Sequence, residues 1–192
     1  MTADPPILYI IAGPNGAGKT TASFNVLPTI LDCREFVNAD EIAKGLSPFD
    51  VESVAIQAGK IMLLRIETLI KQRVSFAIET TLTTGAYVAL IKRAHAIGYK
   101  IHLLFFWLRS PEIAYDRVDK RVREGGHGIP RDIIKRRYWR GLENLFEKFI
   151  PIVDYWAIYD NNEATQEVAD CFHIFDHDKF ELIKELCRKK NT

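Results

Sequence analysis

The sequence predicts an α/β fold of three layers, in which helices cover both faces of a mostly parallel central sheet. Three observations support this prediction. Short strand-like runs alternate with longer helix-like runs along the chain, which is the pattern of repeated β-α-β units. Residues 101–108 form an almost continuously apolar run, as expected of a strand covered on both faces. A glycine-rich turn also joins the first predicted strand, residues 7–11, to the first predicted helix, residues 20–27.

This glycine-rich turn has the spacing G-x-x-x-x-G-K-T of a phosphate-binding P-loop. Its glycines let the backbone turn tightly and direct N–H groups at phosphate oxygens. We expect Lys19 to reach the β- and γ-phosphates of ATP, and the Thr20 hydroxyl to ligate Mg²⁺. The alternative is an ordinary turn with a surface lysine, which the order strand, loop, helix disfavours. The predicted cofactor-binding residues of the loop are Gly13, Pro14, Asn15, Gly16, Ala17, Gly18, Lys19, Thr20 and Thr21.

The remaining elements are placed by hydrophobic periodicity and by helix-terminating residues. Pro28 is expected to end the first helix, and Ser110 to cap a later one with Pro111 in its first turn. Further strands are predicted at residues 35–38, 74–79, 101–108, 155–159 and 172–175. Further helices are predicted at residues 50–73, 85–97, from 111 onward, 131–149 and 178–188.

Composition limits the protein to a few classes. A length of 192 residues with no linker or repeat predicts one domain, residues 1–192. The formal charge is +1, from 26 basic and 25 acidic residues, so nucleic-acid or membrane binding is not expected. The three cysteines are far apart and match neither a disulfide framework nor a metal site. With no signal-peptide pattern and no apolar run near the ~20 residues of a membrane span, we expect a cytoplasmic protein.

Polar residues follow several predicted strands where ligands gather in parallel sheets. Asp40, after the second strand, is our candidate for the base that accepts a proton from an acceptor hydroxyl. A helix cap is an equally weighted alternative for Asp40. The candidate acceptor-binding residues are Asn38, Asp40, Glu79, Thr80 and Thr81.

Two of these strand-end positions have plainer alternatives. Glu79 ends an apolar strand, where a carboxylate is costly unless it is paired, linked to a metal or exposed. It is a candidate for holding a substrate hydroxyl or an Mg²⁺-bound water, and its alternative is a solvated strand end. Asn161, after the fifth strand, is a candidate for bordering the nucleotide base, and its alternative is a turn residue.

Two arginine-rich helices, separated by a glycine-rich break, form the second notable feature. Together they span about residues 111–149 and predict a lid over the phosphates. We select Arg121 and Arg136 as candidate catalytic residues that stabilise transition-state charge. A solvated helix face is the alternative for any single arginine. His127, in the break, is a candidate lid contact or a surface residue.

These motifs together resemble the zeta-toxin family of P-loop kinases, especially its shorter members labelled as predicted ABC-type ATPases. The resemblance covers about residues 8–161 and lies in residues 12–21, 36–43, 79–82 and 125–137. It implies a kinase that transfers the γ-phosphate of ATP to a hydroxyl, which in the studied toxins belongs to UDP-N-acetylglucosamine. It also implies that Lys19 is the P-loop lysine, Asp40 the base and Glu79 an acceptor contact. Lid arginines would contact phosphates, and an antitoxin protein would be a partner.

Two other classes remain open from the sequence. One is a regulatory ATPase that hydrolyses ATP without an acceptor. The other is a polynucleotide 5′-kinase, in which the lid arginines would form a groove for the nucleic-acid backbone. A transporter ATPase is disfavoured, because the chain has no signature loop and no apolar strand ending in Asp-Glu.

Overall fold

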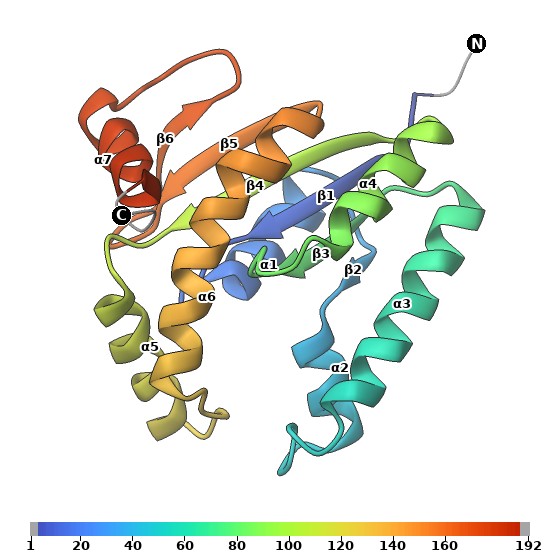
Figure 1. Cartoon of the computed structure of the whole chain (residues 1–192). Coiled ribbons are helices and arrows are strands. Elements are labelled where there is room, and N and C mark those ends of the chain that lie inside the picture. Colours follow the sequence, from blue (N-terminus) through green and yellow to red (C-terminus); the bar gives the residue numbers. More distant parts are fainter. Residues whose placement is uncertain (1–3, 189–192) are drawn as a thin grey trace.

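In the computed structural model, which describes residues 4–188, a six-stranded sheet has the order β2-β3-β1-β4-β5-β6 (Figure 1). The first five strands in this order are parallel, and β6 runs antiparallel to β5. The strands are β1 (Ile7–Ala12), β2 (Phe36–Val37), β3 (Phe76–Thr80), β4 (Lys100–Trp107), β5 (Tyr155–Asp160) and β6 (Gln166–Asp170). The predicted α/β fold with a mostly parallel sheet is confirmed.

Helices enclose this sheet so that its central strands are buried on both faces. Consecutive residues of β1 from Leu8 to Ala12 are all buried, although their side chains alternate between the two faces. The helices are α1 (Lys19–Thr29), α2 (Ala39–Leu46), α3 (Ala55–Gln72), α4 (Ala86–Ala96), α5 (Pro111–Arg123), α6 (Arg131–Asn144) and α7 (His177–Arg188). A π-helical turn, Leu145–Phe149, and a 3-10 turn, Ile150–Ile152, follow α6.

Strand β1 lies where the direction of strand addition reverses. It pairs with β3 on one side and with β4 on the other, so that Ile10 lies opposite Ile78 and Leu103. Ligands of open parallel sheets bind in the crevice at such a reversal, beyond the carboxyl ends of the strands. The helical pairs α2–α3 and α5–α6 extend beyond the sheet on that side, with α1 between them (Figure 1).

Two predicted boundaries near the N-terminal half are wrong. Helix α1 contains Pro28 and continues to Thr29, because proline removes only its own N–H and the N–H of Ile30 still donates to the carbonyl of Val26. The helix expected from residue 50 begins at Ala55, and a separate helix, α2, precedes it.

The sixth strand is also displaced from its predicted position. It lies at Gln166–Asp170, whereas residues 172–175 form a turn that joins it only through a bridge between Ala169 and Ile174. Phe172 and Phe175 are exposed, so their aromatic character did not indicate a buried strand. An edge strand is half solvated and can carry polar residues, which weakens its sequence signal. Within residues 4–188, no helix is both long and apolar enough to cross a membrane.

Candidate active site

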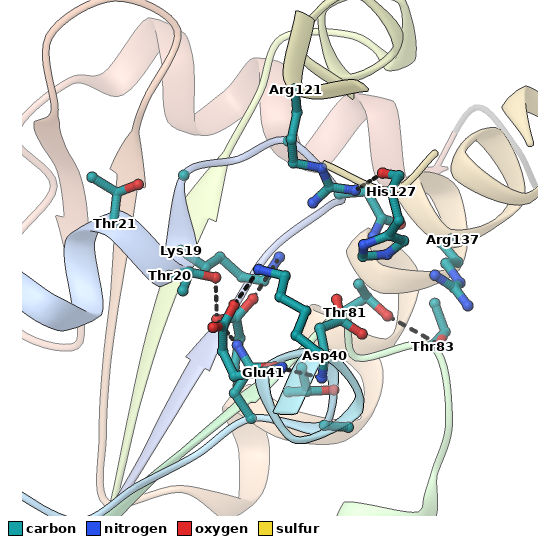
Figure 2. A pocket seen from close by; sticks show the side chains of 18 of the residues that line it. Lys19, Thr20, Thr21, Asp40, Glu41, Thr81, Thr83, Arg121, His127 and Arg137 are labelled. Carbon is teal, nitrogen blue, oxygen red and sulfur yellow. Dashed lines mark hydrogen bonds and ion pairs between the residues drawn. The ribbon is translucent and has the colours of Figure 1, made fainter. Parts of the chain in front are cut away.

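A cavity of about 700 Å³ opens beyond the carboxyl ends of β1 and β3. Its walls come from the P-loop, the start of α2, the segment after β3, helix α5 and the turn between α5 and α6. In Figure 2, Lys19 and Thr20 lie on one side of this cavity, and Arg121, His127 and Arg137 lie on the other. The cavity volume of about 700 Å³ is typical of small-molecule sites in proteins.

The P-loop adopts a conformation that only glycine tolerates at several positions. Gly13 has a φ of +144°, and a Cβ there would lie 2.3 Å from the carbonyl oxygen of Phe106. Gly18, the residue before α1, is left-handed with a φ of +75°. These geometries keep the loop close to β4 and direct the N-terminal end of α1 toward the cavity. The P-loop residues that line the cavity are Asn15, Gly16, Gly18, Lys19, Thr20 and Thr21.

Gly13, Pro14 and Ala17 lie behind this lining and shape the loop. The carbonyl oxygen of Pro14 accepts a hydrogen bond of 3.0 Å from the Lys19 ammonium. Asn161, predicted to border the base, does not line the cavity. Its amide nitrogen instead donates to the carbonyl oxygen of Ala17 at 2.7 Å, so the structure places Asn161 as a support of the P-loop.

Lys19 and Thr20 meet Glu79 at the end of β3. The Thr20 hydroxyl donates to Glu79 Oε2 at 2.7 Å, and Lys19 Nζ lies 3.6 Å from Glu79 Oε1. Burial lowers the pKa of the Lys19 ammonium, while the charges of Glu79 and Asp40 oppose this change. Anionic phosphates placed beside Lys19 would likewise favour its charged form. Glu79 is therefore a paired carboxylate, and its solvated alternative is wrong.

Asp40 lies in the first turn of α2, and the helix-cap alternative for it is wrong. The N-cap of α2 is Asn38, whose Oδ1 accepts hydrogen bonds from the backbone N–H groups of Asp40 and Glu41. Among the described residues, none forms a hydrogen bond or ion pair with the Asp40 carboxylate. That carboxylate lines the cavity and is available to accept a proton.

Threonines form the wall of the cavity that follows β3. Thr80 Oγ1 accepts a hydrogen bond from the N–H of Leu82, and the hydroxyls of Thr81 and Thr83 lie 3.2 Å apart. Helix α6 closes against this segment, because a Cβ at Gly141 would lie 2.6 Å from the carbonyl oxygen of Thr81. The wall thus presents hydroxyl groups on a backbone that is held in place.

The arginines of α5 and α6 divide into those at the cavity and those in solvent. Arg117, Arg121 and Arg137 line the cavity, whereas Arg136 is exposed and does not. Arg136 is two residues from both Ile134 and Tyr138, which are buried, so helix geometry places it on the opposite side of α6. Arg137 was not selected from the sequence as a site residue. Its position three residues after the buried Ile134 would have indicated that it lies beside the buried face of α6.

Arg121 is held by the turn that follows α5. Its Nη2 donates to the backbone carbonyl of His127 at 3.1 Å, and its Nε is buried without a hydrogen-bond partner among the described residues. A Cβ at Gly126 would lie 2.6 Å from Arg121 Cγ, so glycine there allows the close approach. The pKa of His127 is lowered by burial and by the charge of Arg121. An unpartnered buried donor beside the cavity is suited to an anionic ligand.

Arg117 is a further residue that sequence reasoning did not select. It donates from Nη1 to the carbonyl oxygen of Gly16 at 3.3 Å and from Nη2 to that of Asn162 at 2.6 Å. Arg117 therefore joins α5 to the P-loop and to the segment after β5. Only its contacts across the chain reveal this role, because its partners are backbone atoms distant in sequence.

The donor set fits ATP with Mg²⁺. Residues 4–188 contain no cluster of three or more His, Cys, Asp or Glu side chains that could hold a metal alone. Mg²⁺ at nucleotide sites is usually bound by one or two protein oxygens together with phosphates and water. Thr20 donates its only hydroxyl hydrogen to Glu79, which leaves its oxygen lone pairs for a cation.

Comparisons with known proteins identify relatives of this chain. A family model described as Zeta toxin matches residues 2–166. An uncharacterized protein of Haemophilus influenzae is 33% identical over 129 residues, which is 66% of this chain and 88% of that protein.

Solved structures provide a second comparison. The structure of the PezAT chromosomal toxin–antitoxin system of Streptococcus pneumoniae is 18% identical, with a TM-score of 0.66, and the match covers 100% of this chain and 88% of that one. The AvrRxo1-ORF1:-ORF2 structure with ATP is 17% identical, with a TM-score of 0.76. That match covers 94% of this chain but 64% of the other, so this chain spans less than two thirds of that relative.

Proposed function

Since this chain belongs to the zeta-toxin family and is thus an ATP-dependent P-loop kinase, we propose that it transfers the γ-phosphate of ATP to a hydroxyl of a small acceptor. The observation that carries the proposal is the position of Asp40. Its carboxylate, which has no hydrogen bond or ion pair within residues 4–188, lines the same cavity as Lys19 and Thr20. A carboxylate that shares a cavity with the P-loop can orient the hydroxyl of an alcohol and accept its proton during transfer.

The donor side of the reaction is assigned to the P-loop and its partners. The N–H groups of the loop and the N-terminal end of α1 bind the phosphates, and Lys19 neutralises charge that develops during transfer. Thr20, oriented by its hydrogen bond to Glu79, would hold Mg²⁺. The bound metal ion would add electrostatic stabilisation of the phosphates.

The acceptor side is assigned to Asp40 and to the wall after β3. Asp40 accepts the proton of the attacking hydroxyl, and Thr80 and Thr81 bind other polar groups of the acceptor, next to Glu79. Hydroxyl-bearing walls suit a ligand with several hydroxyl groups. A nucleotide sugar, such as a UDP-amino sugar, is our proposed acceptor class.

The helices α5 and α6 are assigned as a lid, about residues 111–149, within a single kinase domain. Arg121 and Arg137 take the role of phosphate contacts, because both line the cavity and the Nε of Arg121 has no hydrogen-bond partner in the described part of the chain. Arg136, our sequence-based candidate, is replaced by its neighbour Arg137 in this proposal.

A protein partner is proposed from the relatives. The PezAT structure is described as a toxin–antitoxin system, and AvrRxo1-ORF1 as a complex with ORF2. By this similarity, we assign an antitoxin protein as the partner of this chain, in the cytoplasm.

The experiment that tests the function follows the phosphate. The protein is mixed with Mg²⁺ and ATP labelled on the γ-phosphate, together with a panel of nucleotide sugars, simple sugars and an RNA with a 5′-hydroxyl. Label on a nucleotide sugar is the expected result. Label on RNA would indicate a polynucleotide kinase, and label only in free phosphate would indicate a regulatory ATPase. Either of these results would overturn the proposed acceptor.

A further inference from the structure

Asn38 connects two parts of the site through a single side chain. It lies between β2 and α2, and only 6% of its surface is exposed. Its Oδ1 accepts a hydrogen bond of 2.8 Å from the N–H of Asp40 and one of 3.4 Å from the N–H of Glu41. Its Nδ2 donates at 2.7 Å to Glu79 Oε2. The carbonyl of this amide therefore caps α2 while its amino group binds the end of β3.

The same oxygen of Glu79 also binds the P-loop. Glu79 Oε2 accepts hydrogen bonds from both Asn38 and the hydroxyl of Thr20, each at 2.7 Å. A continuous path of hydrogen bonds thus runs from the Thr20 hydroxyl through Glu79 and Asn38 to the backbone of Asp40. Its two ends are the proposed metal ligand and the proposed base.

The start of α2 has few other attachments to the sheet. Strand β2, which leads into it, pairs with β3 at only two positions, Phe36 with Ala77 and Val37 with Ile78. Helix α2 is also held by its packing against α3. The side chain of Asn38 adds a direct hydrogen-bonded link from the start of α2 to the end of β3, and this link helps to fix where Asp40 lies relative to the P-loop.

Asn38 lines the cavity, but both its amide oxygen and its amide nitrogen are bound within the protein. We propose that Asn38 is a positioning residue, which fixes the place of Asp40 relative to Thr20 and Glu79, in place of the acceptor contact that its sequence position had indicated. The inference rests on the proposed function, because it concerns the base of that reaction. Asparagine suits this position since Oδ1 can cap a helix while Nδ2 donates elsewhere. Aspartate and serine are comparable caps, but aspartate has no N–H donor and the side chain of serine is shorter.

The bridge also orients the proposed metal ligand. With Asn38 holding Glu79, the carboxylate accepts the Thr20 hydrogen in one direction, and the lone pairs of Thr20 Oγ1 then point to a defined place. Loss of the Asn38 bridge should therefore weaken the contribution of Mg²⁺ to nucleotide binding, even before any phosphate is transferred.

The test compares Asn38→Ser, which keeps the cap and removes the bridge, with Asn38→Ala, which removes both. We expect Asn38→Ser to keep more of the wild-type melting temperature than Asn38→Ala does, because serine keeps the cap. Asn38→Ser should lower kcat about tenfold or more, with the KM for the acceptor little changed, because misplacement of a base slows the chemical step. Asn38→Ala should show the same kcat loss and a lower melting temperature. An Asn38→Ser variant with wild-type kcat, or with only a raised acceptor KM, would overturn the proposal.

Calorimetry separates this inference from the proposed function. Binding of a non-hydrolysable ATP analogue is measured with and without Mg²⁺ for the wild type, Asn38→Ser, Glu79→Ala and the double variant. We expect Asn38→Ser to reduce the Mg²⁺-dependent gain in affinity, and to have no further effect once Glu79 is absent. The proposed role of the bridge would be overturned if Mg²⁺ raised the affinity for the analogue equally in the wild type and Asn38→Ser. It would also be overturned if the effects of Asn38→Ser and Glu79→Ala on this affinity were additive. If the wild type transfers phosphate to no acceptor, the proposed function fails, and these binding data still decide the role of Asn38.

Discussion

The two ends of the parallel sheet use polar side chains in different ways. At the amino end, Asp154 precedes β5, and its carboxylate is bound by Lys100 at 2.8 Å, His95 at 2.7 Å and the N–H of Ile101 at 2.9 Å. Burial raises the pKa of the Asp154 carboxyl, but these hydrogen bonds outweigh it and lower the pKa to about 2. Polar groups at this end are bound to one another.

At the carboxyl end, some buried polar groups have no partner within residues 4–188. Asn15 Oδ1 and Arg121 Nε are buried there without hydrogen bonds, and the carboxylate of Asp40, an exposed residue, lines the same cavity. Buried polar groups are nearly always satisfied, so this end is suited to a ligand that satisfies them. The comparison predicts that changes at the carboxyl end reduce catalysis, whereas changes at the amino end reduce stability.

The largest effect is expected from Lys19→Met, which keeps an unbranched apolar stem and removes the ammonium. Phosphate transfer should fall by about 10³-fold, since no other side chain in the P-loop neutralises charge on the transferred group. The rate is measured with labelled ATP, and circular dichroism checks the fold. A variant that keeps most of its activity would remove Lys19 from the donor site.

The second-largest effect is expected from Asp40→Asn, with a loss of about 10²-fold in kcat. The amide of asparagine cannot take the proton from the attacking hydroxyl. The matched control is Asp178→Asn, which changes an exposed acidic residue in the first turn of α7 and should leave kcat unchanged. Both changes remove a favourable charge near a helix N-terminus, so their effects on stability should be similar. A loss below about tenfold for Asp40→Asn would argue against its role as the base.

A smaller effect is expected from the arginines of α6. Arg137→Ala should lower kcat by about 10-fold or more, since Arg137 lines the cavity and can stabilise phosphate charge. Arg136→Ala, one position earlier on the exposed side of the helix, should retain wild-type kinetics. Steady-state kinetics of the pair decide which face of α6 meets the ligand, and the reverse result would restore Arg136 as the candidate.

The smallest catalytic effect is expected at the amino end. Because the folded-state pKa of Asp154 is lowered to about 2, its ionised form contributes stability above about pH 4, and this contribution is lost as the pH falls toward 2. Asp154→Asn should cost about 1 kcal/mol of stability at neutral pH, because solvent screens the ion pairs of this exposed residue, and it should flatten this dependence, with kcat within about twofold of the wild type. Urea unfolding at several pH values measures the free energy of unfolding and its dependence on pH. A large kcat loss would contradict the separation of the two ends.

Much of the donor site could be predicted from the sequence because it is local. The P-loop spacing and the strand before it are contiguous, and the strand–loop–helix order that they require is observed between β1 and α1. The order of the later strands also indicated that Asp40 and Glu79 follow strands of one sheet. Both line the cavity, since the carboxyl ends of parallel strands share an edge.

Other features depended on contacts that no local pattern contains. The edge strand was predicted at residues 172–175, whereas β6 is Gln166–Asp170. The polar residues of β6 lack a periodic apolar signal. The inward arginine of α6 depends on the rotation of that helix, which packing of Ile134 and Tyr138 determines. Asn161 was assigned to the nucleotide, but its amide binds the P-loop from a position 144 residues away in sequence.

By itself, the sequence determined that this chain is an α/β protein with a P-loop, since backbone conformation and hydrophobic periodicity are local properties. Tertiary structure alone decided which polar groups are paired. Asn38, Glu79 and Thr20 are separated by 18 to 59 positions along the chain, yet they share one carboxylate oxygen in the folded protein. A hydrogen bond depends on distance and direction between atoms, and only the packed sheet brings these three side chains within reach.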